Sequence, residues 1–137
     1  VSAADMAVDA FLKRELGALL PAAAWLSEET ADDPVRLTSD LVWLVDPIDG
    51  TRDFVRGRAG WAVSVALLSA GRPLFGLLEA PARGEHWWAE AGKGATRNGA
   101  ALTASRRTEL AGARVPADTL PRIDADLVPV PRANSIA

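Results

Sequence analysis

The chain has 137 residues, a formal net charge of -3, one histidine and no cysteine. With 49% hydrophobic and 24% charged residues, it has the composition of an ordinary globular protein and the length for one domain with a buried core. The lack of cysteine excludes disulfides, zinc–thiolate sites and cysteine nucleophiles, and the single histidine, His86, excludes a multi-histidine metal site. Any metal site must therefore use oxygen ligands, which suit Mg²⁺, Ca²⁺ or Mn²⁺.

Charge and hydropathy also limit the partners of the chain. The negative net charge and the scattered arginines argue against a nucleic-acid binder, which presents a clustered basic face. No apolar run is long enough to span a bilayer and no signal peptide is visible, so we expect a cytoplasmic protein without a membrane partner. Because the chain starts at Val1 and stops at Ala137, inside what resembles the start of another element, we expect native sequence beyond both ends.

The first predicted element is a helix over residues 1–20, which Pro21 ends. Ser2 is its expected N-cap, with Asp5 three residues later in place of the usual Glu or Gln of a capping box. The expected apolar stripe of this helix consists of Met6, Val8, Phe11, Leu12, Leu16, Leu19 and Leu20.

Two strands are predicted next, each followed by acidic residues. Residues 22–26 form a short apolar run that leads into Ser27-Glu28-Glu29-Thr30, and the polar stretch 31–40 predicts a surface loop. Residues 41–45 form a continuous apolar run with two β-branched side chains, which predicts a buried strand. It enters the turn-rich segment 46–51 directly.

The rest of the chain predicts a meander of strands. One helical turn is expected over residues 52–56, and Asn98-Gly99 is the strongest short hairpin signal. Strands are predicted at residues 61–68, 74–79, 86–90, 102–104, 110–115 and 127–130, with residues 116–126 as a loop or short helix. A leading helix followed by an antiparallel meander indicates the α+β class.

The strongest chemical signal is Asp46-Pro47-Ile48-Asp49-Gly50-Thr51 at the end of the buried strand. Pro47 has a fixed φ and biases Asp46 towards an extended conformation, and Gly50 permits close approach of a ligand to the backbone. Such a loop can direct two carboxylates and a backbone carbonyl at one Mg²⁺ ion, and its amides can bind an anion. Asp-Pro and Asp-Gly pairs also form ordinary turns, but the whole string after a buried strand favours a metal site.

Glu28 and Glu29 form a second acidic group after the first predicted strand. Adjacent residues on a strand point to opposite faces, so at most one of them is expected to join Asp46. Alone, such a pair would be a solvated surface feature, but beside the Asp46 loop the ligand interpretation is the better one.

These motifs resemble those of the inositol monophosphatase family. Residues 41–54 resemble the family signature, Ser27-Glu28-Glu29-Thr30 its Gly-Glu-Glu-Ser element, and residues 1–5 its Val-Thr-x-x-Asp element. Gly92-Lys93-Gly94-Ala95 with Asn98-Gly99 resembles its Gly-x-Gly-Ala…Asn-Gly hairpin. The resemblance implies that residues 1–137 are the N-terminal metal- and phosphate-binding domain of a layered α/β sugar-phosphatase fold, with the C-terminal α/β half missing.

The resemblance also implies roles for individual residues. Glu28 and Asp46 would bind a first Mg²⁺ with the Ile48 carbonyl, and Asp46 and Asp49 a second, with two or three ions in all. Glu29 would act from the outer shell. The amides of Gly50 and Thr51, beside Asp49, would bind the phosphate. The catalytic residues would be Glu28, Thr51 and Asp5, with Asp5 orienting the Thr51 hydroxyl towards the attacking water.

The sequence departs from the family pattern in two respects. The family's remaining metal ligand is an aspartate of a Trp-Asp element in the second half, and no Trp-Asp pair occurs in this sequence. Asn134-Ser135-Ile136-Ala137 resembles the Gly-Ser/Thr-x-Ala segment after which most of that half should follow. The usual upstream helix and lysine are also missing.

The predicted function is that of a Mg²⁺-dependent phosphomonoesterase acting on a small phosphate ester by metal-activated water. Asp53 in place of the commoner Asn leans towards 3′-phosphoadenosine 5′-phosphate, and Ile48 in place of Leu leans towards inositol monophosphate. By analogy, a homodimer is expected. Two alternatives stay open: a catalytically inert truncated domain that serves as a metal-binding or assembly piece, and a Ca²⁺-binding structural module, which the spacing of the acids disfavours.

Other candidate residues have ordinary explanations. His86 is expected to be structural. Two interpretations stay open for Arg52, Arg56 and Arg58: they are solvated surface residues, or they bind a second phosphate. The tryptophans are expected to pack against the sheet rather than to stack on a base; they are Trp43, Trp61, Trp87 and Trp88.

Overall fold

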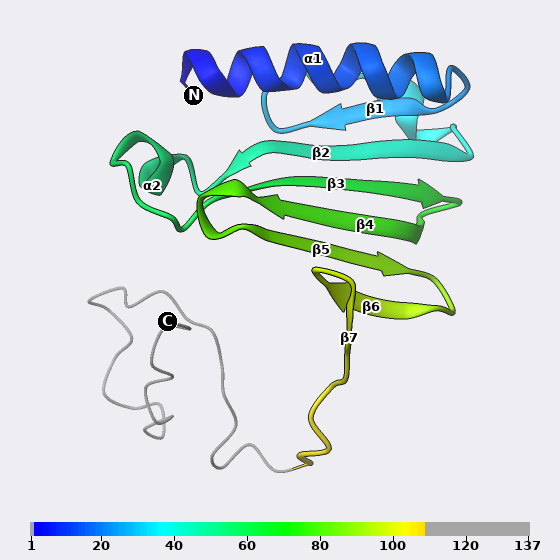
Figure 1. Cartoon of the computed structure of the whole chain (residues 1–137). Helices are drawn as coiled ribbons and strands as arrows, with labels where there is room; N and C mark the ends of the chain where they lie inside the picture. The colour runs from blue at the N-terminus through cyan, green and yellow to red at the C-terminus, as the bar shows by residue number, and fades with distance from the viewer. Residues whose placement is uncertain (1, 109–137) are drawn as a thin grey trace, which may run out of the picture. The chain divides into compact units, whose positions relative to one another are not determined.

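The computed structural model describes residues 2–108 (Figure 1). The chain divides into two units, residues 1–103 and 104–137, and the described helices and strands all belong to the first. The elements are α1 (Ala3–Leu19), β1 (Ala24–Ser27), η1 (Pro34–Leu37), β2 (Leu41–Asp49), α2 (Thr51–Val55), β3 (Ala62–Ser69), β4 (Arg72–Ala80), η2 (Pro81–Arg83), β5 (Glu85–Glu90), β6 (Gly94–Arg97) and β7 (Ala100–Leu102). The predicted strands at residues 110–115 and 127–130, and the segment 116–126, lie outside the described residues.

The strands form one seven-stranded sheet in chain order, β1 to β7 (Figure 1). The pairs from β2 to β7 are antiparallel, which confirms the predicted meander. The first pair is different, because β1 runs parallel to β2. Parallel neighbours need a crossover of about a dozen residues. The segment predicted as a plain loop at residues 31–40 belongs to this crossover and contains the short helix η1.

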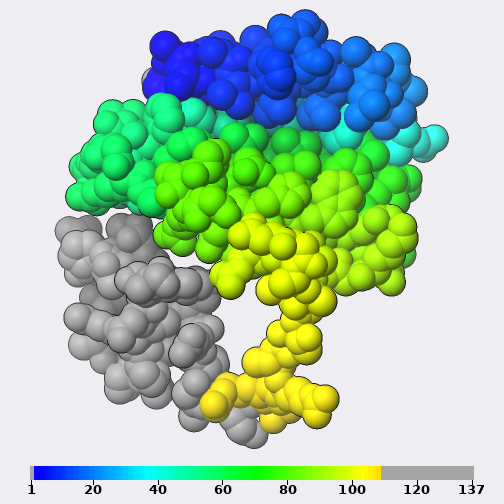
Figure 2. Space-filling view, in the orientation of Figure 1, coloured from blue at the N-terminus to red at the C-terminus, as the bar shows by residue number. Residues whose placement is uncertain are grey.

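α1 covers one face of the sheet, and in the space-filling view it forms a continuous blue layer along the β1–β2 side (Figure 2). The core beneath it consists of Trp43, Val45, Val65 and Leu67. Leu12, Leu16 and Leu20 pack against this core. The capping box predicted at Ser2 is present, with Asp5 as its second member.

The predicted apolar stripe of α1 is partly wrong. Met6, Phe11 and Leu19 are 48%, 53% and 73% exposed, respectively. The face that α1 buries is Asp5, Asp9, Leu12, Leu16 and Leu20, spaced at three or four residues as neighbours on one helical face are. Two acids therefore occupy the N-terminal half of the buried stripe, where sequence hydrophobicity alone favours apolar residues.

β2 is longer than predicted, because the strand continues through Asp46-Pro47-Ile48-Asp49 instead of turning at Asp46. Its pairing with β3 shifts register between Asp46 and Asp49, so the segment forms an irregular bulge. Pro47 is fully buried within it. A bulge accommodates proline because it leaves ladder hydrogen bonds unmade.

Aromatic packing on the sheet agrees with the prediction for the tryptophans. Trp43 meets Phe75 edge-on at 5.7 Å between ring centroids, and Phe75 stacks on Trp88 at 5.0 Å. Trp61 contacts Phe54 of α2 at 5.0 Å. On the face not covered by α1, Trp87 lies under the Arg97 guanidinium. No helix within residues 2–108 is both long and apolar enough to cross a membrane.

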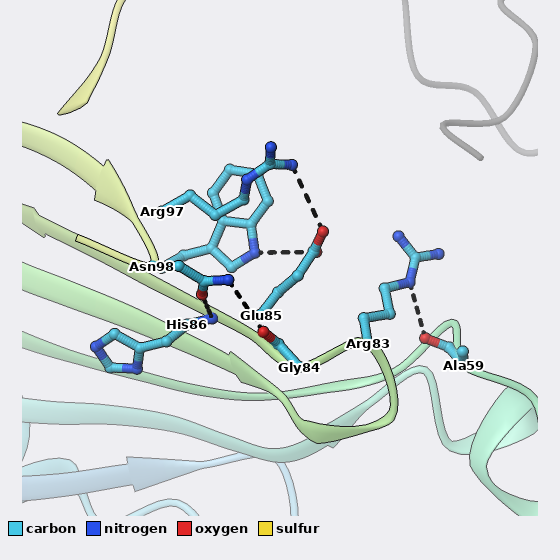
Figure 3. Close-up of polar contacts among 8 residues, drawn as sticks. Ala59, Arg83, Gly84, Glu85, His86, Arg97 and Asn98 are labelled. Atoms are coloured by element: carbon cyan, nitrogen blue, oxygen red, sulfur yellow. Dashed lines mark hydrogen bonds and ion pairs between the residues drawn. The ribbon is translucent and has the colours of Figure 1, made fainter. Parts of the chain in front are cut away.

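The β6–β7 turn is fastened by Asn98, as Figure 3 shows. Its amide oxygen accepts a hydrogen bond from the His86 N–H at 2.7 Å, and its amide nitrogen donates to the Gly84 carbonyl at 3.1 Å. Asn98 also has a positive φ of 49°, which asparagine tolerates better than most residues.

Asn98→Ala should lower the free energy of unfolding by about 1 kcal/mol, because it removes two exposed hydrogen bonds and strains the turn. Urea unfolding would measure the change. Asn98→Gly separates the two causes, since glycine loses the same hydrogen bonds without backbone strain. Equal stability of all three proteins would contradict the prediction.

Candidate functional site

The parallel pairing of β1 and β2 brings the two acidic motifs together. Ser27 is in register with Val45, so the next residues, Glu28 and Asp46, stand side by side where β1 ends and the bulge of β2 begins. The Glu28 N–H donates to the Val45 carbonyl at 3.3 Å and holds this alignment. Glu28 is exposed and Asp46 half-buried. As expected for adjacent strand residues, one of the two glutamates joins Asp46, and it is Glu28.

The electrostatics of Asp46 show that several acids gather at this edge. Burial, a side-chain hydrogen bond with Glu28 and the charges of Glu28 and Asp49 raise the pKa of Asp46 to about 6, against a backbone hydrogen bond at Ile48 that lowers it. The ion pairs within residues 2–108 engage other acids, such as Asp32, Asp53 and Glu85. The arrangement therefore favours a cation between these carboxylates or a proton on Asp46.

The raised pKa predicts how the stability of the metal-free chain depends on pH. A carboxyl group whose folded pKa exceeds its unfolded value binds its proton more tightly in the folded state, so stability falls as pH rises from about 4 to about 6. With allowance for solvent screening, the loss should be about 1–2 kcal/mol. Urea unfolding at pH 4.5 and 7 should show this loss in the parent relative to Asp46→Asn. Parallel pH profiles of the two proteins would contradict the prediction.

The described acids make an incomplete metal centre. Within residues 2–108, no three His, Cys, Asp or Glu side chains form a group that could hold a metal ion. Glu28 and Asp46 are in contact, whereas Asp49 acts on Asp46 through its charge alone. The donors are carboxylates and a carbonyl, the hard oxygen ligands that Mg²⁺ takes. This donor set fits the start of a Mg²⁺ site that needs further ligands.

The predicted phosphate loop follows the bulge of β2. Gly50 has a φ of +92° and caps α2, and its carbonyl accepts from the N–H groups of Asp53 and Phe54. The Thr51 hydroxyl donates to the Ile48 carbonyl at 3.1 Å. Thus Ile48 and Thr51, which the resemblance places in different roles, are bonded to each other.

Asp5 lies in the buried face of α1 with none of its surface exposed. One carboxylate oxygen accepts from the Ser2 N–H, and the other, Oδ1, is buried without a hydrogen-bond partner. Burial raises the pKa of Asp5, but hydrogen bonds with Ser2, the charge of the N-terminus and a backbone hydrogen bond together outweigh burial and lower the pKa overall. The structure gives no hydrogen bond between Asp5 and Thr51, so the predicted orienting role stays a prediction.

Asp9 is the residue that sequence reasoning missed. It is buried one turn after Asp5 and accepts hydrogen bonds from the Ser27 and Thr30 hydroxyls. Glu29, predicted to act from the outer shell, is held beside it by its N–H, which donates to the Ser27 hydroxyl at 3.3 Å. The signal available in the sequence was the spacing of Asp9 to Asp5 and Leu12 on one helical face.

Glu28 and Asp46 line a groove, and the loop that follows α2 is held in place by a hydrogen bond. A groove of about 390 Å³ runs from Glu28 and Asp46 over the face of the sheet that α1 leaves uncovered. The loop after α2 is tied to η2, because the Arg83 Nε donates to the Ala59 carbonyl at 3.0 Å (Figure 3). Within this loop, Gly60 packs against Gly50.

His86 lies away from this site. It belongs to β5, three strands from β2 in the sheet order. Its ring Nδ1 contacts the Glu79 carboxylate at 2.7 Å at an exposed position. This partner agrees with the prediction of a structural histidine.

Comparison with known proteins gives concordant matches. The sequence profile of the inositol monophosphatase family matches residues 1–127. The histidinol-phosphatase of Mycobacterium tuberculosis is 42% identical over 95 residues, which are 69% of this chain and 36% of that protein. The 3′-phosphoadenosine 5′-phosphate phosphatase of Mycobacterium bovis is 47% identical over 88 residues, which are 60% of this chain and 33% of that protein.

A solved structure shows the same arrangement of helix and sheet. The extragenic suppressor protein suhB from Bartonella henselae matches with a TM-score of 0.73 and 34% identity, over 81% of this chain and 43% of that one. The chain therefore spans less than half the length of these relatives. The match confirms the predicted fold class, including the prediction that the chain carries part of the fold.

Proposed function

This chain belongs to the inositol monophosphatase family, and on that premise we propose that it is the metal- and phosphate-binding part of a Mg²⁺-dependent phosphomonoesterase. The observation that supports this best is the pairing of Glu28 with Asp46 where β1 ends and the bulge of its parallel neighbour β2 begins. Relatives that share 42% and 47% identity are named as phosphatases of small phosphate esters.

In this proposal, Glu28, Asp46, Asp49 and the Ile48 carbonyl hold Mg²⁺. Bound Mg²⁺ supplies positive charge that neutralises the phosphate ester and eases the ionisation of a water molecule. Burial and the neighbouring carboxylates of Glu28 and Asp49 raise the pKa of Asp46, and a bound cation would relieve the repulsion between these charges. Further ligands must come from outside residues 2–108, because these residues lack a complete metal-holding group.

The phosphate would be bound beside these ligands. The N–H groups of Gly50 and Thr51 stand at the start of α2, where the first amides of a helix have no partner within it. The Thr51 hydroxyl would orient the attacking water, with Asp5 and Glu29 in support. Electrostatic stabilisation of this kind is required because uncatalysed hydrolysis of phosphate monoesters is extremely slow.

The proposed substrates are 3′-phosphoadenosine 5′-phosphate and inositol monophosphate, with histidinol phosphate added by the name of one relative. The test is Mg²⁺-dependent phosphate release from these three esters and fructose 1,6-bisphosphate, with Asp46→Asn as the control. We expect release from one of them that requires Mg²⁺ and disappears in the variant. Release that persists without Mg²⁺, or in Asp46→Asn, would contradict the proposed mechanism.

A second candidate function is a domain that binds metal but is inert by itself. It is favoured by the incomplete metal group within residues 2–108 and by the small share of each relative that the chain spans. Mg²⁺ binding by calorimetry without phosphate release from any substrate would support it. Light scattering would test the predicted homodimer in the same samples.

A further inference from the structure

Asp9 joins α1 to the segment that carries the two glutamates. It lies one turn after Asp5 on α1 and is 5% exposed. Its Oδ1 accepts from the Ser27 hydroxyl, and its Oδ2 accepts from the Thr30 hydroxyl at 2.7 Å. One carboxylate therefore holds both ends of Ser27-Glu28-Glu29-Thr30.

Glu28 and Glu29, which lie between these two ends, are held by hydrogen bonds of their backbone N–H groups. The Ser27 hydroxyl, which donates to Asp9, also accepts from the Glu29 N–H at 3.3 Å. The Glu28 N–H is bonded to the Val45 carbonyl, next to Asp46. Hence the backbone on either side of the Glu28 side chain has a set position relative to α1 and β2.

The side chain of Asp9 is better suited to holding Ser27 and Thr30 by hydrogen bonds than to packing in the apolar core. Its neighbours on the buried face of α1 are Asp5 on one side and Leu12, which packs on the core, on the other. Burying a carboxylate there costs free energy unless hydrogen bonds compensate, and two hydroxyl groups do so. A leucine at the same position would pack on the core but could not accept either hydrogen bond.

We infer that Asp9 is a positioning residue that orders Ser27–Thr30 and thereby aligns the Glu28 carboxylate with Asp46. This inference rests on the proposed function, since it assigns the alignment to Mg²⁺ binding. Groups that orient metal ligands typically contribute about 10- to 100-fold to metal affinity. Asp9 acts through Ser27 and Thr30 and does not itself contact the ion.

The test compares Asp9→Asn with Glu15→Gln, a matched loss of charge at an exposed position of the same helix. The two hydroxyl groups donate to different carboxylate oxygens of Asp9, and in asparagine one of these oxygens is replaced by an NH₂ group, which cannot accept, so one hydroxyl group loses its acceptor. In the metal-free chain, we expect amide hydrogen exchange at Glu29 and Thr30 to accelerate about 10-fold, while exchange at Trp43 stays unchanged. By calorimetry, we expect Mg²⁺ affinity to fall about 10-fold. Glu15→Gln should change neither quantity.

Thr30→Val provides a second variant that keeps Asp9 in place, with Thr38→Val as its control because the exposed Thr38 hydroxyl donates to the Val35 carbonyl of η1. Thr30→Val should show the same local acceleration and a smaller loss of Mg²⁺ affinity. Unchanged exchange and unchanged Mg²⁺ affinity in folded Asp9→Asn would overturn the inference. So would acceleration spread evenly over the sheet, because Asp9 would then serve general stability.

The two proposals fail in different ways. If the parent chain does not bind Mg²⁺, the proposed function fails and the assignment to metal binding is overturned. In that case, amide hydrogen exchange at Glu29 and Thr30 would still show whether Asp9 orders Ser27–Thr30. If the parent binds Mg²⁺ and Asp9→Asn binds it equally well, only the inference about Asp9 fails.

Discussion

Asp46→Asn should abolish the stabilisation that Mg²⁺ gives to the chain, while the metal-free variant should be as stable as the parent or more stable at pH 7. Asp46 carries a raised pKa because it is half-buried beside Glu28 and Asp49. A neutral amide removes this repulsion and can donate a hydrogen bond to the Glu28 carboxylate. The same change removes the carboxylate that touches Glu28 and would share the metal ion with it.

The stability of Asp46→Asn without Mg²⁺ and its response to Mg²⁺ together distinguish a metal ligand from an aspartate with a purely structural role. Loss of a structural aspartate would lower stability with or without Mg²⁺. Loss of a ligand at a crowded site should leave the metal-free stability equal or higher by about 1 kcal/mol and remove the response to Mg²⁺. Ligand binding stabilises the folded state by RT ln(1 + [L]/Kd), or about 2.7 kcal/mol at one hundred times Kd.

Thermal melts of the parent and of Asp46→Asn at several Mg²⁺ concentrations would measure both effects. Asp40→Asn is a suitable control, since Asp40 is an exposed aspartate next to the start of the same strand. It should retain the full response to Mg²⁺. If Asp46→Asn responds to Mg²⁺ as the parent does, Asp46 is not a ligand.

Much of the fold could be predicted because its signals are local. The apolar run 41–45, the Asn98-Gly99 turn and the capping box at Ser2 each depend on neighbouring residues, and the structure contains all three. The direction of β1 is not a local property. Whether two strands pair in parallel depends on the path of the segment that connects them. No single residue among 28–40 indicates that path.

The candidate site was predictable as a set of residues but not as a geometry. Sequence reasoning placed Asp46 in a turn, whereas the structure continues the strand through a bulge that contains the buried Pro47. Strand alternation alone left open which glutamate joins Asp46, whereas the family resemblance assigned Glu28, and the parallel register places Glu28 there. Asp9 was missed because its role depends on two hydroxyl groups 18 and 21 residues away.

Gly50→Ala should be among the most destabilising single substitutions in the predicted phosphate loop, for two separable reasons. Gly50 has a φ of +92°, which costs an alanine about 1–2 kcal/mol. A Cβ at this position would also lie 2.4 Å from the Gly60 carbonyl oxygen and 3.1 Å from the Trp61 Cα. Both neighbours are backbone atoms, so relief requires the loop itself to move, at a further cost of about 1–3 kcal/mol.

Gly57→Ala isolates the first reason, because Gly57 has a φ of +65° but nothing lies within 4 Å of its would-be Cβ. Both substitutions carry the cost of positive φ, so the difference between them reports the contact of Gly50 with Gly60. We expect Gly50→Ala to be the less stable by about 1–3 kcal/mol in urea unfolding. The displaced loop would carry Asp49 and the Thr51 amide with it, so Gly50→Ala should also weaken the response to Mg²⁺, whereas Gly57→Ala should retain it. Equal stability and equal Mg²⁺ response in the two variants would mean that the Gly50–Gly60 contact does not hold the loop. In that case, α2 and β2 alone would have to maintain the geometry of the phosphate site.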